Sequence, residues 1–174
     1  MVYKDFHYER LELEKSKSIL NKIISDFKNA VSAKKQIDAI KEVDSFSREY
    51  MTYQAMASLN YSRDINDDSA KNEKDYYDSI SPDMIEVFDR FDKALHQSNF
   101  KSEIVDMFGE TFLNQIEINL KTFDSKIKDM LKEEIKLKND YTKLTAGAKI
   151  EFEGKKYNLA GLGPFHSDVN RSVR

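Results

Sequence analysis

The sequence predicts a mainly all-α protein in which long antiparallel helices form an open helical lobe, with one β-hairpin near the C-terminus. Hydrophobic residues recur at intervals of three and four along most of the 174 residues, as on one face of an α-helix. Residues 1–108 contain no glycine and a single proline, whereas four of the five glycines fall within the last 28 positions. After residue 148 the hydrophobic period changes to two, which is typical of a β-strand.

Two long helices are expected at the start of the chain. The first covers residues 12–31, because its apolar residues have helical spacing: Leu20, Ile23, Ile24, Phe27, Ala30 and Val31. Ser32 can cap a second helix of about 30 residues and about 45 Å. The apolar residues of this helix are Ile37, Ile40, Val43, Phe46, Tyr50, Tyr53 or Met51, Ala57 and Tyr61. The polar run at 65–69 predicts a connection, after which the chain returns antiparallel.

The returning segment is interrupted by Pro82, which has no N–H group to donate. Its apolar residues keep the helical period on both sides of the proline: Tyr76, Tyr77, Ile80, Met84, Ile85, Val87, Phe88, Phe91, Ala94 and Leu95. Pro82 is compatible with a kink in one long helix. It is equally compatible with the first turn of a new helix capped by Ser81.

Three further helices are predicted before the hairpin. The first covers residues 101–108 and ends at Gly109, which can adopt the left-handed conformation that terminates helices. The second covers residues 111–122. Ser125 can cap a last long helix, whose apolar period continues to Gly147.

The hairpin is predicted at residues 149–159, where apolar and polar residues alternate on both sides of Gly154. The apolar positions are Ile150, Phe152, Tyr157 and Leu159. A two-stranded ribbon is marginal alone, so it needs support from the helices or from another partner. We therefore divide the chain into a helical lobe at 1–148, the hairpin at 149–159, and a loop at 160–174 that contains the start of a further helix.

Residues 167–174 have the composition of a helix cap and first turn, without the length that helix nucleation needs. We therefore expect this chain to be the first part of a longer one. Separation from the remainder would leave apolar residues uncovered, so the isolated chain is expected to self-associate or to have a mobile C-terminus. These residues are Ile150, Phe152, Tyr157, Leu159, Leu162 and Phe165.

Charge and composition exclude several classes of protein. With 28 basic and 31 acidic residues, the net charge is −3 and the pI is near 5.7, without the basic excess of a nucleic-acid or anionic-membrane binder. The absence of cysteine excludes disulfide frameworks, thiol nucleophiles and zinc sites with cysteine ligands. The sequence shows neither a signal peptide nor an apolar run of about 20 residues. We expect a soluble, cytoplasmic protein without nucleic-acid or membrane partners.

Residues able to carry catalytic or metal chemistry form no known motif. None of the histidines lies four residues from another, so the zinc-binding His-Glu-x-x-His pattern is absent; they are His7, His96 and His166. The acidic run at 64–68 lacks the glycine and the distal glutamate of a calcium loop, so its aspartates are interpreted as helix caps. Glu133 and Glu134 lie among lysines at helical spacing, which predicts an exposed helix face. We assign no catalytic, cofactor-binding or metal-ligating residue.

The tyrosines allow two interpretations. Six of them lie on or beside the predicted helical stripes: Tyr50, Tyr53, Tyr61, Tyr76, Tyr77 and Tyr141. Large side chains with one polar tip suit a helical core. The alternative is a groove lined by phenols, which could serve a small-molecule or peptide carrier.

In its order and spacing of short motifs, the chain resembles the N-terminal part of the oligoendopeptidase F family, relatives of thimet oligopeptidase among the zinc metallopeptidases. The similar segments are 3–13, Asp-Ile-Asn-Asp at 64–67, Ile-Ser-Pro at 80–82, Leu-Lys-Thr-Phe at 120–123, 141–144, 148–154, Asn-Leu at 158–159, and 167–174. The chain departs from the family at Asn60 and Tyr61, where an Arg-His pair is expected, and at Ser69 and Ala70, where aromatic residues are expected.

This resemblance implies a helical lobe that forms one wall of a deep peptide channel and partners the catalytic lobe of the same polypeptide. In the family, zinc is held by the two histidines of His-Glu-x-x-His and a downstream glutamate, and short peptides are cleaved. Those residues lie beyond position 174, so the resemblance implies no catalytic or metal residue here and no activity of the chain alone. The alternative function is a free-standing helical module that binds a partner protein.

Overall fold

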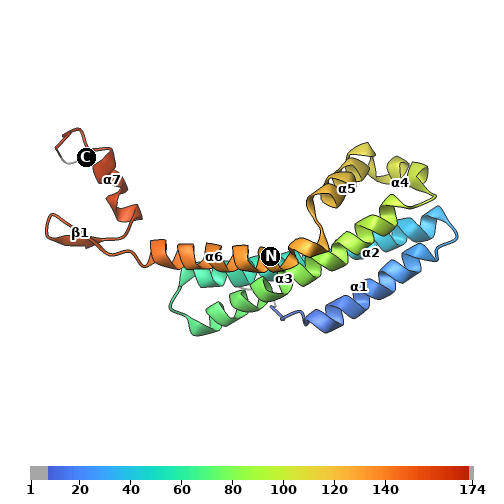
Figure 1. Cartoon of the computed structure of the whole chain (residues 1–174), viewed down its shortest axis with the longest axis horizontal. Coiled ribbons are helices and arrows are strands. Elements are labelled where there is room, and N and C mark those ends of the chain that lie inside the picture. The colour runs from blue at the N-terminus through green and yellow to red at the C-terminus, as the bar shows by residue number, and fades with distance from the viewer. Residues whose placement is uncertain (1–7, 173–174) are drawn as a thin grey trace. The chain divides into compact units, whose positions relative to one another are not determined.

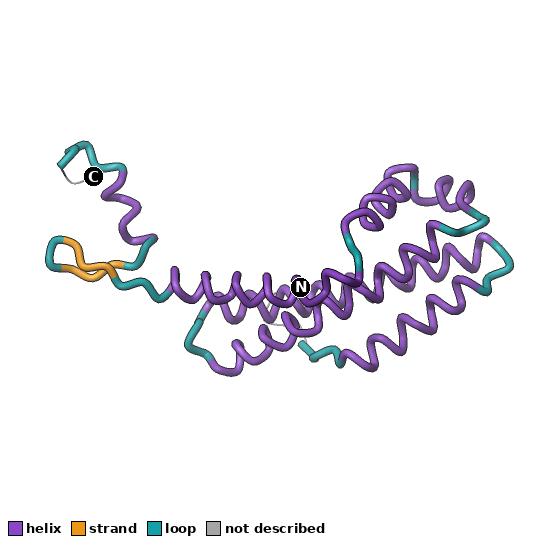
Figure 2. Tube along the Cα trace, in the orientation of Figure 1, coloured by secondary structure: helices purple, strands orange, loops and turns teal. Residues whose placement is uncertain are grey.

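The computed structural model describes residues 8–172 and confirms a mainly α-helical fold with a two-stranded hairpin near the C-terminus (Figure 1). Figure 2 shows how strongly helices dominate the secondary structure. In chain order the elements are α1 (Leu13–Lys28), α2 (Ala33–Arg63), α3 (Asp68–His96), α4 (Lys101–Phe108), α5 (Glu110–Thr122), a 3-10 turn (Ser125–Ile127), α6 (Lys128–Ala146), β1 (Ile150–Phe152), β2 (Lys155–Tyr157), a second 3-10 turn (Ala160–Leu162) and α7 (Gly163–His166).

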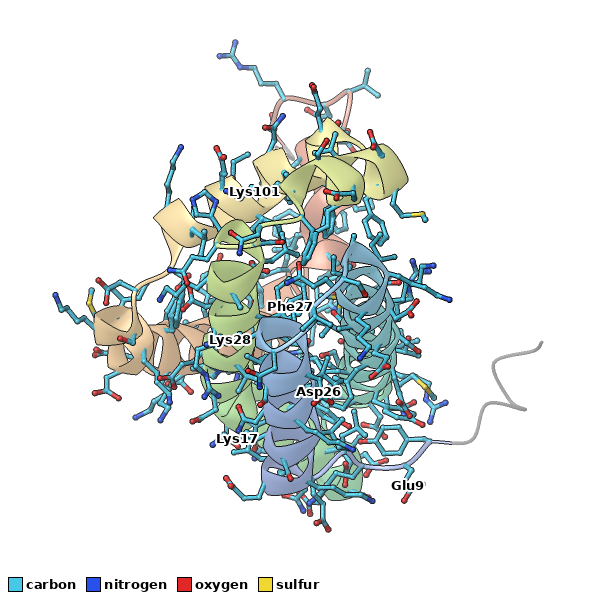
Figure 3. All side chains as sticks on the ribbon, turned by 90° about the vertical axis from the view of Figure 1, so that its right-hand side faces the viewer. Glu9, Lys17, Asp26, Phe27, Lys28 and Lys101 are labelled. Carbon is cyan, nitrogen blue, oxygen red and sulfur yellow. The ribbon has the colours of Figure 1, made fainter. Side chains whose placement is uncertain are left out.

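The chain divides into two compact units. Unit 1 ends at Asp129 and unit 2 begins at Met130. In unit 1, α1, α2 and α3 pack pairwise as a three-helix bundle, α5 packs on α3, and α4 packs on α5 and α2. Figure 3 shows Glu9 beside the end of this bundle where α1 begins, and Lys101 at the opposite end.

The core of unit 1 is built from the apolar stripes that the sequence predicts. Rings from α1 and α3 meet edge to face: the centroids of Phe27 and Phe91 are 5.3 Å apart and their planes are inclined by 69°. Burial of each large apolar side chain contributes about 1.5–3 kcal/mol to folding, so this cluster holds the bundle together. The large side chains that are less than 2% exposed are Tyr77, Phe27, Leu20, Met84, Leu95, Ile104, Val87 and Pro82.

The first helix ends earlier than predicted. It stops at Lys28, and Val31, which we expected on the apolar face, is 83% exposed. The backbone N–H of Asn29 caps the end of α1, and Ser32 has an extended backbone and accepts a hydrogen bond from the Lys35 N–H. Residues 29–32 are therefore needed for the turn between α1 and α2, which places Val31 outside the helix.

Pro82 lies inside one continuous helix, α3, which resolves the two alternatives left open by the sequence. Asp67 begins this helix by accepting hydrogen bonds from the N–H groups of Ser69 and Ala70. Proline removes one backbone hydrogen bond, but the apolar residues on both sides of Pro82 are buried in the same core. Tertiary packing therefore maintains the helix across the proline.

Gly109 separates α4 from α5, as the sequence predicts. Its φ of 84° is positive, and its ψ of 159° gives an extended conformation that is essentially restricted to glycine rather than a left-handed helical one. Its N–H donates to the Val105 carbonyl at 2.7 Å and closes α4, while Glu110 begins α5 directly. One glycine thus both ends a helix and redirects the chain.

The chain enters α6 through a cap that differs from the prediction. Asp124, and not Ser125, accepts a hydrogen bond from the Lys126 N–H, and Ser125 begins a 3-10 turn. Asp124 has an extended backbone, which places its carboxylate at the exposed N–H groups of the turn. Lys128 then anchors this part of unit 1 to α3 through contacts of 2.7 Å with Asp83 and with Glu86.

Unit 2 contains the predicted hairpin, in which Ile150 pairs with Tyr157 and Phe152 with Lys155. Glu153 and Gly154 both have positive φ, at 49° and 74°, as a tight two-residue hairpin turn requires. Support for the hairpin comes from Phe165 of α7, whose ring centroid lies 4.9 Å from Phe152 and 5.2 Å from Tyr157.

The segment after the hairpin differs from the predicted loop and helix start. Residues 160–166 form a 3-10 turn and the short helix α7, in which Pro164 has the fixed φ that suits a first helical turn. Over the described residues 167–172 the chain forms turns instead of a helix, because Asp168 and Asn170 accept hydrogen bonds from N–H groups two residues ahead.

Helix α6 is far less covered than the helices of the bundle. None of its residues, all of which the structure describes, is buried. Four large apolar side chains recur along one face at helical spacing and are more than 60% exposed: Met130, Leu137, Tyr141 and Leu144. Within residues 8–172, no helix combines the length and apolar character needed to cross a membrane.

Candidate functional site

Five tyrosines gather where the chain enters α1. Tyr50 and Tyr53 come from α2, Tyr76 and Tyr77 from α3, and Tyr8 from the segment before α1. Ring centroids are 5.9 Å apart for Tyr50 and Tyr77, 5.5 Å for Tyr76 and Tyr77, and 5.6 Å for Tyr8 and Tyr53. We call these five residues the tyrosine cluster.

Four of the six tyrosines that the sequence singled out belong to this cluster, and two lie elsewhere. Tyr61 is buried near the C-terminal end of α2 with Lys74 near its ring, and Tyr141 is exposed on α6. Tyr8 was missed, because it precedes the first helical period. The available signal was its place in the segment 3–13, which is among those that resemble the peptidase family.

Two hydroxyls of the tyrosine cluster bind backbone of this chain itself. The Tyr76 hydroxyl donates to the Leu11 carbonyl at 2.8 Å and accepts from the Leu13 N–H at 3.1 Å. The Tyr77 hydroxyl accepts from the Leu11 N–H at 3.2 Å. We call this set of three hydrogen bonds the clasp. It satisfies backbone groups of Leu11 and of Leu13, the first residue of α1, which have no partner within the helix itself.

An ion pair reinforces the clasp. The Arg10 guanidinium lies 4.5 Å from the Tyr76 ring centroid and donates to both carboxylate oxygens of Glu73, and the Tyr8 hydroxyl donates to Glu73 Oε2 at 2.6 Å. Hydrogen bonding from Arg10 lowers the pKa of Glu73. Burial, and then the Glu73 carboxylate, raise the pKa of Tyr8. At neutral pH the carboxylate is therefore ionised and the phenol is protonated.

A groove with a volume of about 360 Å³ lies beside the clasp. It is lined by Glu9, Arg10, Leu11, Glu12, Lys15, Ser16, Ile19, Phe46, Glu49 and Tyr53. These residues include charges of both signs but no cysteine or histidine. Burial raises the pKa of nearby Tyr50 to about 12, so that phenol is not a proton acceptor near neutral pH. The groove is therefore a mixed-charge surface hollow beside the clasp.

Another hollow, of about 430 Å³, lies at the turn between α1 and α2. Asp26, which is labelled in Figure 3, lines it together with Asp38, Glu42 and Lys35. Across residues 8–172, no group of three or more histidine, cysteine, aspartate or glutamate side chains could hold a metal ion. The described residues therefore do not fit a zinc centre.

The acidic and histidine residues considered from the sequence remain apart. Asp67 caps α3 as the capping interpretation predicts, whereas Asp64 accepts a hydrogen bond from the Asn66 N–H within the loop. Glu134 pairs with Lys138 at 2.6 Å on an exposed face. His96 and His166 are exposed, while His7 lies outside the described residues.

A third hollow, of about 210 Å³, lies between α3 and α5 and was not anticipated from the sequence. It contains Asp89 and Asp92, three residues apart on α3, with Asn119 of α5 opposite. The Asn119 amide donates to Asp92 Oδ2 at 3.0 Å. The available sequence signal was a pair of aspartates three residues apart in a predicted helix.

A sequence model described as the Peptidase M3 N-terminal domain matches residues 3–123. An oligoendopeptidase F structure is 32% identical in sequence, with a TM-score of 0.92. The matched region covers 100% of this chain and 31% of that protein. PZ peptidase A with an inhibitor is also 32% identical, with a TM-score of 0.92. The matched region covers 99% of this chain and 31% of that protein.

Oligoendopeptidase F from Bacillus anthracis str. Ames is 30% identical, with 100% and 32% coverage and a TM-score of 0.92. This chain therefore spans about a third of the length of each of these structures. Comparison with the curated proteins gave no match.

The clasp predicts a measurable effect of one hydroxyl. Replacing Tyr76 with phenylalanine removes two of the three hydrogen bonds to the 11–13 backbone, and should lower the free energy of unfolding by about 1–2 kcal/mol. Amide exchange at Leu13 should accelerate. The control is Tyr61→Phe, which leaves the clasp unchanged. Equal losses of stability in the two variants, measured by urea denaturation, would refute the role of the clasp.

Asp92 predicts a pH dependence of stability. Burial, and then the charge of Asp89, raise its pKa from 3.8 to about 6 in the folded chain. Because the folded state holds this proton more tightly than the unfolded state, Asp92 stabilises the fold below pH 4, and this contribution is lost as the pH rises through 6. Asp92→Asn should therefore raise the free energy of unfolding at pH 7 by about 1–3 kcal/mol.

The difference between Asp92→Asn and the parent chain should shrink towards zero as the pH falls to about 4. Chemical denaturation from pH 4 to 7 measures this. The control, Asp106→Asn on the exposed side of α4, should change stability by less than about 0.5 kcal/mol at every pH. A lower stability of Asp92→Asn at pH 7 would contradict the prediction.

Proposed function

Because the chain belongs to the Peptidase M3 N-terminal domain family, we propose that it is the non-catalytic helical lobe of a zinc metallo-oligoendopeptidase. In that role it forms one wall of the channel that admits short peptides. Its partner is the catalytic lobe of the same polypeptide, and the complete enzyme acts in the cytoplasm.

The observation that carries this proposal is the extent of structural similarity. Three peptidase structures align with 99–100% of this chain at 30–32% identity, and the aligned region is about a third of each. Every element described above, the hairpin included, thus has a counterpart in a longer peptidase. The remaining two thirds of such a protein can supply what this chain does not contain.

The chemistry of the described residues is consistent with the proposed non-catalytic role. They provide no set of three metal ligands, and the sequence has no His-Glu-x-x-His pattern. A zinc ion held by residues outside this chain would supply polarisation of the peptide bond and activation of water. The contribution of this chain is the rigid three-helix bundle, whose core and clasp fix the position of the channel wall.

Unit 2 offers the surface through which the lobe can join the rest of the enzyme. The apolar side chains of Met130, Leu137, Tyr141 and Leu144 lie along one face of α6, as expected for a helix that packs on a partner. The same exposure also supports the alternative of a free-standing helical module that binds another protein. It would further allow self-association of the isolated chain.

The carrier alternative receives less support. Tyr76 and Tyr77 use their hydroxyls on the backbone of residues 11–13, so they are not available to a ligand. The Tyr8 hydroxyl is likewise bound to Glu73. The two tyrosines of α3 therefore do not offer free hydroxyls to a ligand-binding groove.

The proposal is tested by peptidase activity in the presence of zinc. The 174-residue chain alone should release no product from a quenched fluorescent peptide, whereas the longest polypeptide encoded by its reading frame should cleave it and be inhibited by a chelator. Chelator-sensitive cleavage by the chain alone would overturn the non-catalytic role. A reading frame that ends at Arg174 would favour the helical interaction module instead.

A further inference from the structure

The hollow between α3 and α5 combines apolar walls with two carboxylates. Its volume is about 210 Å³, and it is lined by Ile85, Phe88, Asp89, Asp92, Asn119, Thr122 and Phe123. The sides are formed by one isoleucine and two phenylalanine rings. Phe88 also contacts Tyr50, with ring centroids 6.3 Å apart, so this wall of the hollow continues into the core of the bundle.

Asp89 has a carboxylate oxygen without a hydrogen-bond donor. The residue is 8% exposed, and its Oδ2 accepts from Lys93 at 2.6 Å. Its Oδ1 is fully buried and has no partner among the described residues. Buried carboxylate oxygens normally have donors, and leaving one without a donor destabilises the folded state.

Asp92 adds a second negative charge on the same side of α3. Its Oδ2 accepts one hydrogen bond, from the neutral amide of Asn119, whose own oxygen is held by Gln115 at 3.0 Å. Among the described residues 8–172, Asp92 forms no ion pair with a lysine or arginine. The residues that line the hollow include no lysine or arginine, and Lys93, which pairs with Asp89, is not among them and is 55% exposed.

The charge of the hollow is therefore incompletely balanced. Burial and the neighbouring Asp89 raise the pKa of Asp92 to about 6, so the carboxylate is ionised at neutral pH at a cost to stability. Perturbed carboxylates within a hollow are characteristic of binding sites. A bound cation would remove this cost.

We propose that this hollow binds a guanidinium group carried on an alkyl stem, the chemistry of an arginine side chain. The planar group pairs with the carboxylate of Asp92, and its positive charge offsets the negative charge of the neighbouring Asp89. The stem packs against Ile85, and the face of the guanidinium stacks on Phe88 or Phe123.

The lining favours an organic cation over a metal ion. Divalent metals bound by oxygen take six or more ligands, whereas this hollow offers two carboxylates, one of which already pairs with Lys93. Apolar rings contribute nothing to metal coordination but stabilise an alkyl stem and a delocalised cation. The volume of the hollow also suits one side chain. This inference does not depend on the proposed function, because it concerns residues of unit 1 alone.

The test compares two probes of the same shape that differ in charge. N-acetylarginine methylamide carries the guanidinium group, and N-acetylcitrulline methylamide replaces it with a neutral urea. Each is titrated into the 15N-labelled 174-residue chain, and amide shifts are followed by NMR. The arginine probe should give saturable shifts at residues 85–92 and 119–123 with a Kd of about 1 mM or below. The citrulline probe should bind at least about tenfold more weakly.

Matched variants assign the effect to the hollow. Asp92→Asn should weaken binding of the arginine probe about tenfold, whereas Asp106→Asn, which removes the same charge from an exposed position on α4, should change it less than about twofold. Asp92→Asn is expected to be at least as stable as the parent chain at pH 7, so loss of binding cannot be attributed to unfolding.

Two further titrations identify the source of the cation and test a metal. Agmatine binding as strongly as the arginine probe would support recognition of the guanidinium head alone. Preference for the blocked arginine would support recognition of a peptide side chain. Equal binding of the citrulline probe, no saturable shift with the arginine probe, unchanged binding by Asp92→Asn, or tighter binding of magnesium chloride at the same amides would each overturn the proposal.

Discussion

The structure of unit 1 depends on the burial of one helix, α3, on which α1, α2 and α5 all pack directly. Apolar residues occupy more than one face of this helix, so its burial requires several neighbours at once. This explains why Pro82 does not divide α3, since the packing on both sides outweighs one missing hydrogen bond. It also explains the clasp, because Tyr76 and Tyr77 of α3 bind the backbone that leads into α1.

Most of the fold could be predicted from the sequence, because helical period and helix caps are local properties. The errors occur where a neighbouring turn, another capping residue or a side-chain contact decides the local structure. Val31 has helical spacing, but the turn before Ser32 excludes it from α1. Asp124 replaces Ser125 as the cap, since either side chain suits that position by composition. Residues 160–166 form helical turns in which Phe165 packs on Phe152 and Tyr157, a contact that the hydrophobic period does not reveal.

The candidate sites were less predictable than the fold. Tyrosines on helical stripes can be read from spacing, but spacing does not reveal that two of their hydroxyls bind residues 11–13. Asp89 and Asp92 become neighbours of Asn119 only when α5 packs on α3, and this contact depends on the redirection of the chain at Gly109. The same packing that completes the core thereby buries two carboxylates, so stability and the proposed cation site are opposed at one position. Residues that lower the stability of the fold are common at binding sites.

The proposed function requires that the exposed apolar face of α6 joins a catalytic partner lobe. Amide hydrogen exchange over residues 130–166 tests it most directly, measured in the 174-residue chain and in the longest polypeptide that its reading frame encodes. Protection of these amides should rise at least about tenfold in the longer polypeptide, while that of α1, α2 and α3 stays constant. Equal protection of residues 130–166 in the two proteins would contradict the claim.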